Sequence, residues 1–264
     1  MYTNVVDYHD VIEYTKESII KNGPAFKGHI STPYEWDWVG CTKEQMLDYI
    51  ENGYEPEEVQ LDNLPLPKIV PGPRFVYAEE GDELDIDLAI EGEMDCWVTR
   101  KPVRAKPGIN LEIMMAFSAG MSAKVINEYA AWVAGAITAL ERMGYAYEIS
   151  AINIANNVHH RHRDTSMTKV VLKRMMDANL NDWKLMFSAG GFRTVMFTAK
   201  CMSALDKDNP RMCRGSLGQP NVPGWGVKWD AETRTVRVEC AKAASIFPAK
   251  EMSDKFGEII SNNI

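Results

Sequence analysis

Residues 109–155 constrain the fold more than any other part of the sequence. Two apolar segments, 109–118 and 145–155, flank a stretch from about Ser122 to Met143 in which apolar residues recur every three or four positions. This spacing is typical of an amphipathic helix with one face on a sheet, and Gly144 is a typical helix stop. A strand, a helix and a strand joined by short links form a right-handed crossover with parallel strands. The sequence therefore predicts an α/β fold with a mainly parallel central sheet flanked by helices.

The rest of the chain contains weaker secondary-structure patterns and one break. Proline recurs through residues 61–73, which predicts a linker because proline fixes φ and removes a backbone donor. We therefore divide the chain into a helical N-terminal region, residues 1–75, and an α/β core domain, residues 76–264. The patterns predict helices over 5–20, 42–52, 180–187, 192–205 and 251–260, and strands over 96–100, 167–172 and 233–240.

Charge is distributed unevenly along the chain. Residues 1–100 contain 7 basic and 22 acidic residues, whereas residues 101–264 contain 22 basic and 15 acidic ones, so the net charge of −8 averages two unlike parts. The basic part suggests a surface that meets phosphate. The acidic part is either a solvated face or a surface that docks a basic protein partner.

Composition limits the location and the chemistry. No apolar run reaches the roughly 20 residues that cross a bilayer, and the first residues lack the basic and apolar regions of a signal peptide. We expect a cytoplasmic protein without a membrane partner. The 5 cysteines are widely spaced and form no Cys-x-x-Cys pair, so we expect reduced, mostly buried thiols, no metal site and no cofactor.

The turn from Ser118 to Ser122 is the first candidate site. It lies between the first predicted parallel strand and the long helix, and Gly120 is at its centre. Backbone N–H groups at a helix N-terminus, with two hydroxyl groups, are able to hold an anion. The alternative is that Ser122 is only the helix N-cap and Gly120 eases the turn.

The same segment resembles the opening of a von Willebrand factor A-type domain, whose metal site begins Asp-x-Ser-x-Ser. The aligned residues here are Ala116, Ser118 and Gly120, so the resemblance implies a degenerate core without the ion site. About half of the chain, from Gly81 through Ala204, is similar to a family of uncharacterised tailed-phage proteins. The similar motifs are Glu93-Met94-Asp95-Cys96, Ala119-Gly120-Met121-Ser122 and Leu140-Glu141-Arg142-Met143-Gly144-Tyr145. This similarity implies a phage origin, hence the cytosol of a host cell, and no particular activity.

A second candidate site follows the second parallel strand, at residues 156–163, on the expected sheet edge of the Ser118 turn. This segment combines His159, His160 and His162 with Arg161 and Arg163. It is interpreted as a phosphate-contacting loop, a metal site, a general acid or base, or simply a solvated polar loop. The interleaved arginines would repel a metal cation, which disfavours the metal site. No nucleophile lies at a recognisable spacing, which disfavours a general base. Phosphate contact is the favoured functional interpretation.

The third candidate site surrounds the long loop 209–228, where basic residues are interleaved with tryptophans. This combination is typical of proteins that bind single strands, because cations follow the backbone while rings stack on bases. The alternative is that the tryptophans only close the core. The predicted nucleic-acid contacts over the whole chain are Arg161, Arg163, Lys169, Lys173, Arg174, Arg193, Lys200, Arg211, Arg214, Trp225, Lys228 and Trp229.

Together these patterns predict a non-catalytic phage protein that binds nucleic acid, with single-stranded DNA favoured, as an accessory factor in phage transcription or replication. A phage RNA polymerase or another phage protein is the expected partner of the acidic region. The main alternative is a von Willebrand A-like protein-interaction module that uses Tyr34, Trp36 and Trp38. A third interpretation is an enzyme acting on nucleic acid through residues 157–162 with Ser118 and Ser122. No motif requires it, so we expect no enzyme.

Overall fold

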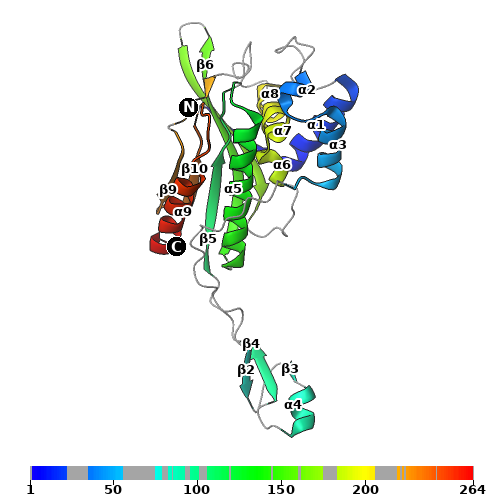
Figure 1. The fold of residues 1–264 in the computed structure, drawn as a ribbon, viewed down its shortest axis with the longest axis vertical. Coiled ribbons are helices and arrows are strands. Elements are labelled where there is room, and N and C mark those ends of the chain that lie inside the picture. Colours follow the sequence, from blue (N-terminus) through cyan, green and yellow to red (C-terminus); the bar gives the residue numbers. More distant parts are fainter. Residues whose placement is uncertain are drawn as a thin grey trace.

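The computed structural model describes most of the chain and contains two separate sheets (Figure 1). The described residues are 2–22, 35–55, 75–78, 83–84, 86–92, 96–100, 106–118, 120–143, 145–159, 162–174, 183–205, 219–220, 222, 224–241 and 243–263.

The main sheet has seven strands, six of which follow the order β1-β7-β6-β5-β10-β9, while β8 pairs with β6. Their bounds are β1 Tyr2–Asp7, β5 Lys106–Met114, β6 Tyr145–His159, β7 His162–Lys173, β8 Gln219–Pro220, β9 Gly226–Asp230 and β10 Thr235–Glu239. Strands β1/β7, β5/β6 and β5/β10 are parallel. Strands β6/β7, β6/β8 and β9/β10 are antiparallel. The expected α/β class is confirmed, but the sheet is mixed and not mainly parallel.

The central crossover agrees with its prediction. Strand β5 leads through helix α5 (Ala123–Arg142) into β6, and the two strands pair in parallel from Ile109↔Tyr147 to Met114↔Ile152. Ser122 caps the helix, because its hydroxyl accepts a hydrogen bond from the N–H of Val125 at 3.3 Å. The apolar stripe of α5 is buried against the sheet, as its period requires.

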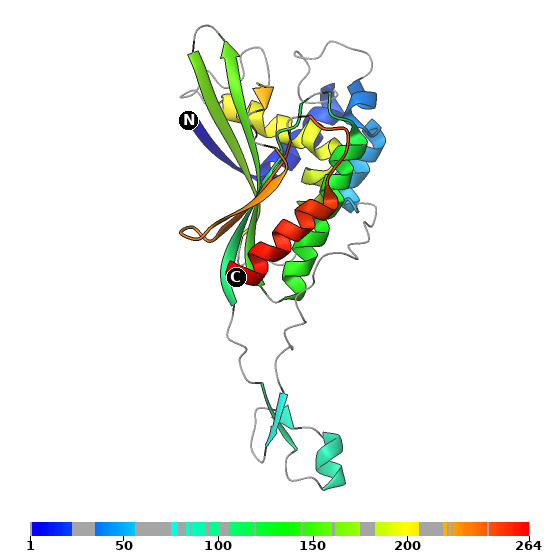
Figure 2. The ribbon, with the colours of Figure 1, turned by 60° about the vertical axis from the view of Figure 1, so that its left-hand side comes forward.

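We call the main sheet and the helices that pack on it the main unit. The described helices of this unit lie on one side of the sheet (Figure 2). Besides α5 they are α1 Tyr8–Asn22, α2 Glu35–Val39, α3 Lys43–Asn52, α6 Lys184–Phe187, α7 Ala189–Gly191, the π-helix η2 Phe192–Met196, α8 Phe197–Leu205 and α9 Ala249–Asn263. The alternation of side chains along strand β5 explains why helices cover only one side of the sheet. Its residues Ile109, Leu111 and Ile113 are buried, whereas Asn110 and Glu112 alternate with them and are only half-buried.

Two elements correct the sequence-based predictions. The helix expected from residue 5 starts at Tyr8, because Tyr2–Asp7 form β1 and pair with Ser166–Val171 of β7. The polar loop expected at residues 156–163 is largely a continuation of β6 and β7, which form a hairpin. A connection this short joins only antiparallel strands, which is one reason why the sheet is mixed.

A second sheet is formed by β2 (Phe75–Ala78), β4 (Trp97–Arg100) and β3 (Glu83–Leu84), with α4 (Ile86–Glu91) following β3. The strand expected over residues 96–100 therefore exists, but it belongs to this small antiparallel sheet and not to the core. The predicted boundary between residues 75 and 76 lies within β2.

One hydrophobic core extends through the main unit. It includes Tyr129 and Trp132 of α5, but also Val11 and Ile19 of α1 and Met46 of α3. Helices that we assigned to a separate N-terminal region thus bury their apolar side chains in the same core as the sheet. None of the helices in the described part of the chain is long and apolar enough to span a bilayer.

Candidate functional site

The hairpin of β6 and β7 extends beyond the strands beside it in the main sheet. Strand β5 pairs with β6 as far as Ile152, and β1 pairs with β7 only from Ser166 onward. Beyond these points the two strands pair with each other, and Asn156 also pairs with Gln219 of β8. We call residues 156–165 the β-arm. At about 3.3 Å per residue, it extends about 13 Å along the strand direction.

The β-arm contains the basic segment that the sequence singled out. Its register pairs the backbone of Val158 with that of Arg163 and of His159 with His162. His160 and Arg161, between them, lie outside the described residues. The predicted site therefore occupies the end of a two-stranded ribbon.

The Ser118–Ser122 turn is held by contacts within the protein. The Ser118 carbonyl accepts the N–H of Met121 at 3.1 Å, and the N–H of Ala116 donates to Cys240 Sγ at 3.4 Å. Since the Ser122 hydroxyl accepts the N–H of Val125, its N-cap interpretation is confirmed. Gly120 is exposed, and anion binding at this turn stays a prediction.

Arg193 connects this turn to helix α2 from inside the protein. It is 3% exposed, and its guanidinium donates to the carbonyls of Met121 and Trp38. The guanidinium also lies 4.8 Å from the centre of the Trp38 ring. Burial lowers its pKa to about 10, so it remains charged at neutral pH. The expected phosphate contact is corrected to a structural clamp, because π-helix η2 places Arg193 in the interior.

Two predicted lysine contacts are also buried. Lys173 Nζ lies 4.3 Å from the centre of the Tyr147 ring, which gives the ammonium a cation–π partner. Lys200 is buried in α8, which contacts β7 and β1. Neither lysine presents its charge to solvent, so both predictions as nucleic-acid contacts are corrected.

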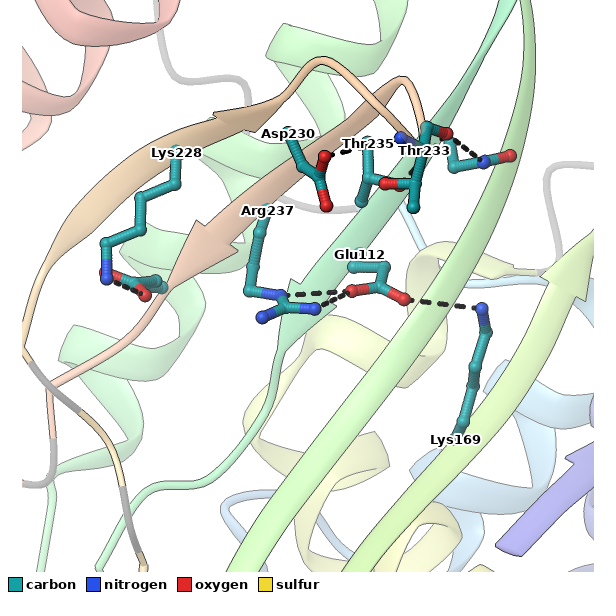
Figure 3. A network of polar contacts seen from close by, with 9 residues as sticks. Glu112, Lys169, Lys228, Asp230, Thr233, Thr235 and Arg237 are labelled. Carbon is teal, nitrogen blue, oxygen red and sulfur yellow. Dashed lines mark hydrogen bonds and ion pairs between the residues drawn. The ribbon is translucent and has the colours of Figure 1, made fainter. Parts of the chain in front are cut away.

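Three more predicted cations have carboxylate partners, two of them in the network of Figure 3. Glu112 accepts hydrogen bonds from Arg237, at 3.0 Å from Nε and 2.6 Å from Nη2. Its other oxygen lies 3.4 Å from Lys169 Nζ. Lys228 pairs with Glu239 at 2.6 Å, and Arg174 pairs with Asp7 at 3.6 Å. Each of these three cations thus has a carboxylate beside it, and their contacts with nucleic acid stay predictions.

Sequence analysis missed Glu112 as the centre of this network. The signal was present in the alternation of β5, since Glu112 lies between Leu111 and Ile113, which are buried against the helices. A charged residue at that position has to point to the opposite side of the sheet. Its partners come from β10 and β7, on either side of the β5–β6 pair.

The two predicted stacking tryptophans contact the protein itself. Trp225 belongs to an aromatic cluster, with its ring centre 5.5 Å from that of Tyr129 and 5.1 Å from that of Phe247. The interpretation that it closes the core is thereby confirmed. Trp229 is half-buried on β9, and the guanidinium carbon of Arg234 lies 5.9 Å from its ring centre.

Asp230 begins the turn to β10, and hydrogen bonds from Thr233 and Glu232 lower its pKa.

The remaining predicted site residues lie beyond what the structure describes. Arg211 and Arg214 are outside the described residues, as is Arg161. Tyr34, from the alternative aromatic surface, is outside them too. Trp36 and Trp38 of that surface are half-buried against the core. Among the side chains that are described, no three of His, Cys, Asp and Glu gather in a group able to hold a metal ion.

Comparison with known families covers nearly the whole chain. A family model described as "Domain of unknown function (DUF7192)" matches residues 2–252. The chain belongs to this family. The DUF7192 match begins with β1 and ends within α9, so it includes both sheets and the β-arm. No curated protein and no solved structure matches the chain.

Two cysteines of this DUF7192 chain should resist alkylation. Burial raises the pKa of Cys41 to about 11 and that of Cys240 to about 12. Because the thiolate is the reactive form, less than about 1% of either thiol is reactive at pH 8. We expect iodoacetamide at pH 8 to leave both cysteines unmodified in the folded protein, as measured by peptide mass spectrometry. The same reaction in urea is the control and should modify both. Rapid labelling of folded Cys240 would contradict its burial.

Proposed function

We propose that the protein binds nucleic acid without a catalytic step, through the β-arm. The observation that supports this most is that the His- and Arg-rich segment 156–165 forms a two-stranded ribbon beyond the neighbouring strands. Arginines on such a ribbon contact phosphates, and a ribbon of this width also fits a nucleic-acid groove. Because Lys173, Arg193 and Lys200 are buried, we propose Arg161 and Arg163 as the principal cations. Arg211 and Arg214 stay predictions.

Single-stranded DNA is the proposed ligand. Histidine rings and arginine planes stack on unpaired bases, and the β-arm contains three histidines in four residues. This replaces stacking by Trp225, which is packed in the aromatic cluster. Duplex DNA is the competing ligand, because two-stranded ribbons enter the major groove.

Two finer parts of the proposal rest on resemblance. A degenerate von Willebrand A-like core is supported by the parallel β5–α5–β6 unit with its serine-containing turn. An accessory role in phage transcription or replication, beside a phage RNA polymerase, is supported only by the similarity of residues 81–204 to phage proteins. A cytosolic location in the host follows from that origin.

Fluorescence anisotropy with labelled single-stranded and duplex oligonucleotides of equal length, across a salt series, tests this proposal. We expect the wild type to bind the single strand more tightly. Arg161→Ala/Arg163→Ala should weaken binding at least about tenfold and make the slope of log K against log salt less negative by about 1.4. Arg174→Ala is the matched control. This cation is 68% exposed and lies on the same chain segment about 36 Å from Arg163, so its loss should change little.

Each other outcome contradicts part of the proposal. Absence of binding at low salt would exclude nucleic acid as the ligand. Equal losses in Arg174→Ala and in the double variant would indicate diffuse attraction without a site on the β-arm. Tighter binding of the duplex would replace single-stranded DNA by a groove-bound duplex.

A further inference from the structure

The second sheet and its helix expose an unusual share of apolar side chains. Of the eight large hydrophobic residues that are exposed in the described chain, four come from residues 75–100. They are Leu84, Ile86, Ile90 and Trp97, and we call them the apolar patch. Ile86 is 64% and Ile90 is 79% exposed. Single exposed hydrophobics are ordinary, but a group of them in one small unit indicates an interaction site.

The geometry of the unit puts these side chains together in pairs. Leu84 and Trp97 are directly opposite each other in the β3–β4 register, so their side chains share one face of the small sheet. Ile86 and Ile90 are four residues apart on α4, so they share one side of that helix. Only residue 85 separates β3 from α4. The two pairs are therefore neighbours in the chain.

The charge of the sequence segment that contains the apolar patch selects its partner. Residues 75–100 contain nine acidic residues and one basic residue, Arg100. The acidic residues are Glu79, Glu80, Asp82, Glu83, Asp85, Asp87, Glu91, Glu93 and Asp95. This density of carboxylates repels nucleic acid and anionic membranes and attracts lysine and arginine. Two copies of the same unit would also repel each other, which disfavours a symmetric dimer through this surface.

We propose that the apolar patch docks a basic, amphipathic segment of another protein. Apolar side chains of that segment cover Ile86, Ile90 and Trp97, and its lysines and arginines pair with carboxylates of residues 75–100. Apolar anchors combined with complementary charge are common in such interfaces. The inference does not depend on nucleic-acid binding, because it concerns a different segment with the opposite charge.

A defined peptide probe tests the proposal with the full-length protein. The probe is a fluorescent 18-residue peptide of leucine and lysine, patterned as an amphipathic helix. Two comparison peptides are a scrambled sequence of the same composition and a leucine–glutamate version. We expect the amphipathic leucine–lysine peptide to bind, the scrambled one at least about tenfold more weakly, and the acidic one not at all.

Substitutions in the apolar patch locate the binding site. Ile86→Ser/Ile90→Ser should weaken binding of the amphipathic peptide at least about tenfold. Ile246→Ser is the matched control, since that isoleucine is 76% exposed outside this unit, and it should bind as the wild type does. Because all three isoleucines are exposed, circular dichroism and the Tm should be unchanged in both variants.

Several results would overturn the proposal. Equal binding of the scrambled peptide would show attraction by charge alone, and wild-type affinity in Ile86→Ser/Ile90→Ser would exclude the patch. A wild-type dimer in sedimentation that this variant dissociates would assign the patch to a second copy. The oligonucleotide assay separates the two proposals. Ile86→Ser/Ile90→Ser should keep single-strand binding, and Arg161→Ala/Arg163→Ala should keep peptide binding.

Discussion

Arg193→Met is expected to lower the free energy of unfolding by about 3 to 5 kcal/mol. The variant loses two hydrogen bonds from a charged donor to buried carbonyls, each worth about 1.5 to 3 kcal/mol. It also loses the cation–π contact with Trp38. Methionine refills part of the volume but leaves the carbonyls of Trp38 and Met121 without their partner. Urea unfolding followed by circular dichroism measures the effect.

The control for this prediction is Arg174→Met, which removes an exposed arginine and should change stability by less than about 0.5 kcal/mol. The Arg193 variant should also bind oligonucleotides as the wild type does, at a temperature where it is folded. A stability loss below about 1 kcal/mol would contradict the clamp. Weaker oligonucleotide binding by the folded variant would restore Arg193 to the ligand site.

Gly191→Ala is expected to destabilise the protein by about 3 kcal/mol or more. A Cβ atom at residue 191 would lie 1.8 Å from the carbonyl oxygen of Leu185 and 3.0 Å from the Cα of Met186. Both are backbone atoms, so relief requires that α6 and α7 move apart, which costs more than the adjustment of a side chain. Thermal and urea unfolding of the variant measure the loss.

Substitutions at two other glycines serve as controls for this prediction. A Cβ at Gly120 would meet nothing within 4 Å, so Gly120→Ala should stay within about 0.5 kcal/mol of the wild type. A Cβ at Gly190 would lie 3.1 Å from Cys41 Sγ, a side-chain atom that is able to move, so its effect should be intermediate. If Gly191→Ala proved as stable as Gly120→Ala, the close approach of α7 to Leu185 would be wrong.

Local patterns in the sequence predicted the centre of the fold but not its edges. The β5–α5–β6 crossover follows from the spacing of apolar residues in one continuous segment. The pairing of Tyr2–Asp7 with Ser166–Val171 joins residues more than 160 positions apart, and periodicity does not report such contacts. The same reason explains the β-arm. Asn156 and Asn157 have low strand propensity, and their strand conformation comes from the partner strand β7.

The candidate site was predicted less well, because counting cations ignores their partners. Glu112 and Arg237 are 125 residues apart in sequence, so their ion pair was not foreseeable from the charge pattern. Arg193 was counted as a surface cation because basic residues recur over residues 161–214, but π-helix η2 turns it into the core. The charge imbalance between the two parts of the chain remains a real property. Among the described residues, however, several of the counted cations are buried or lie beside carboxylates.

The strand order also determines when all strands of the main sheet have their partners during synthesis on the ribosome. Strand β5 meets β6 soon after both are made, but its other neighbour, β10, arrives only with Thr235–Glu239. Strand β1 is among the first residues made and waits for Ser166–Val171. Until then two strand edges are open to pairing with other chains. We therefore expect slow folding dominated by long-range pairing, and chains interrupted before Thr235 should aggregate more readily than the complete one.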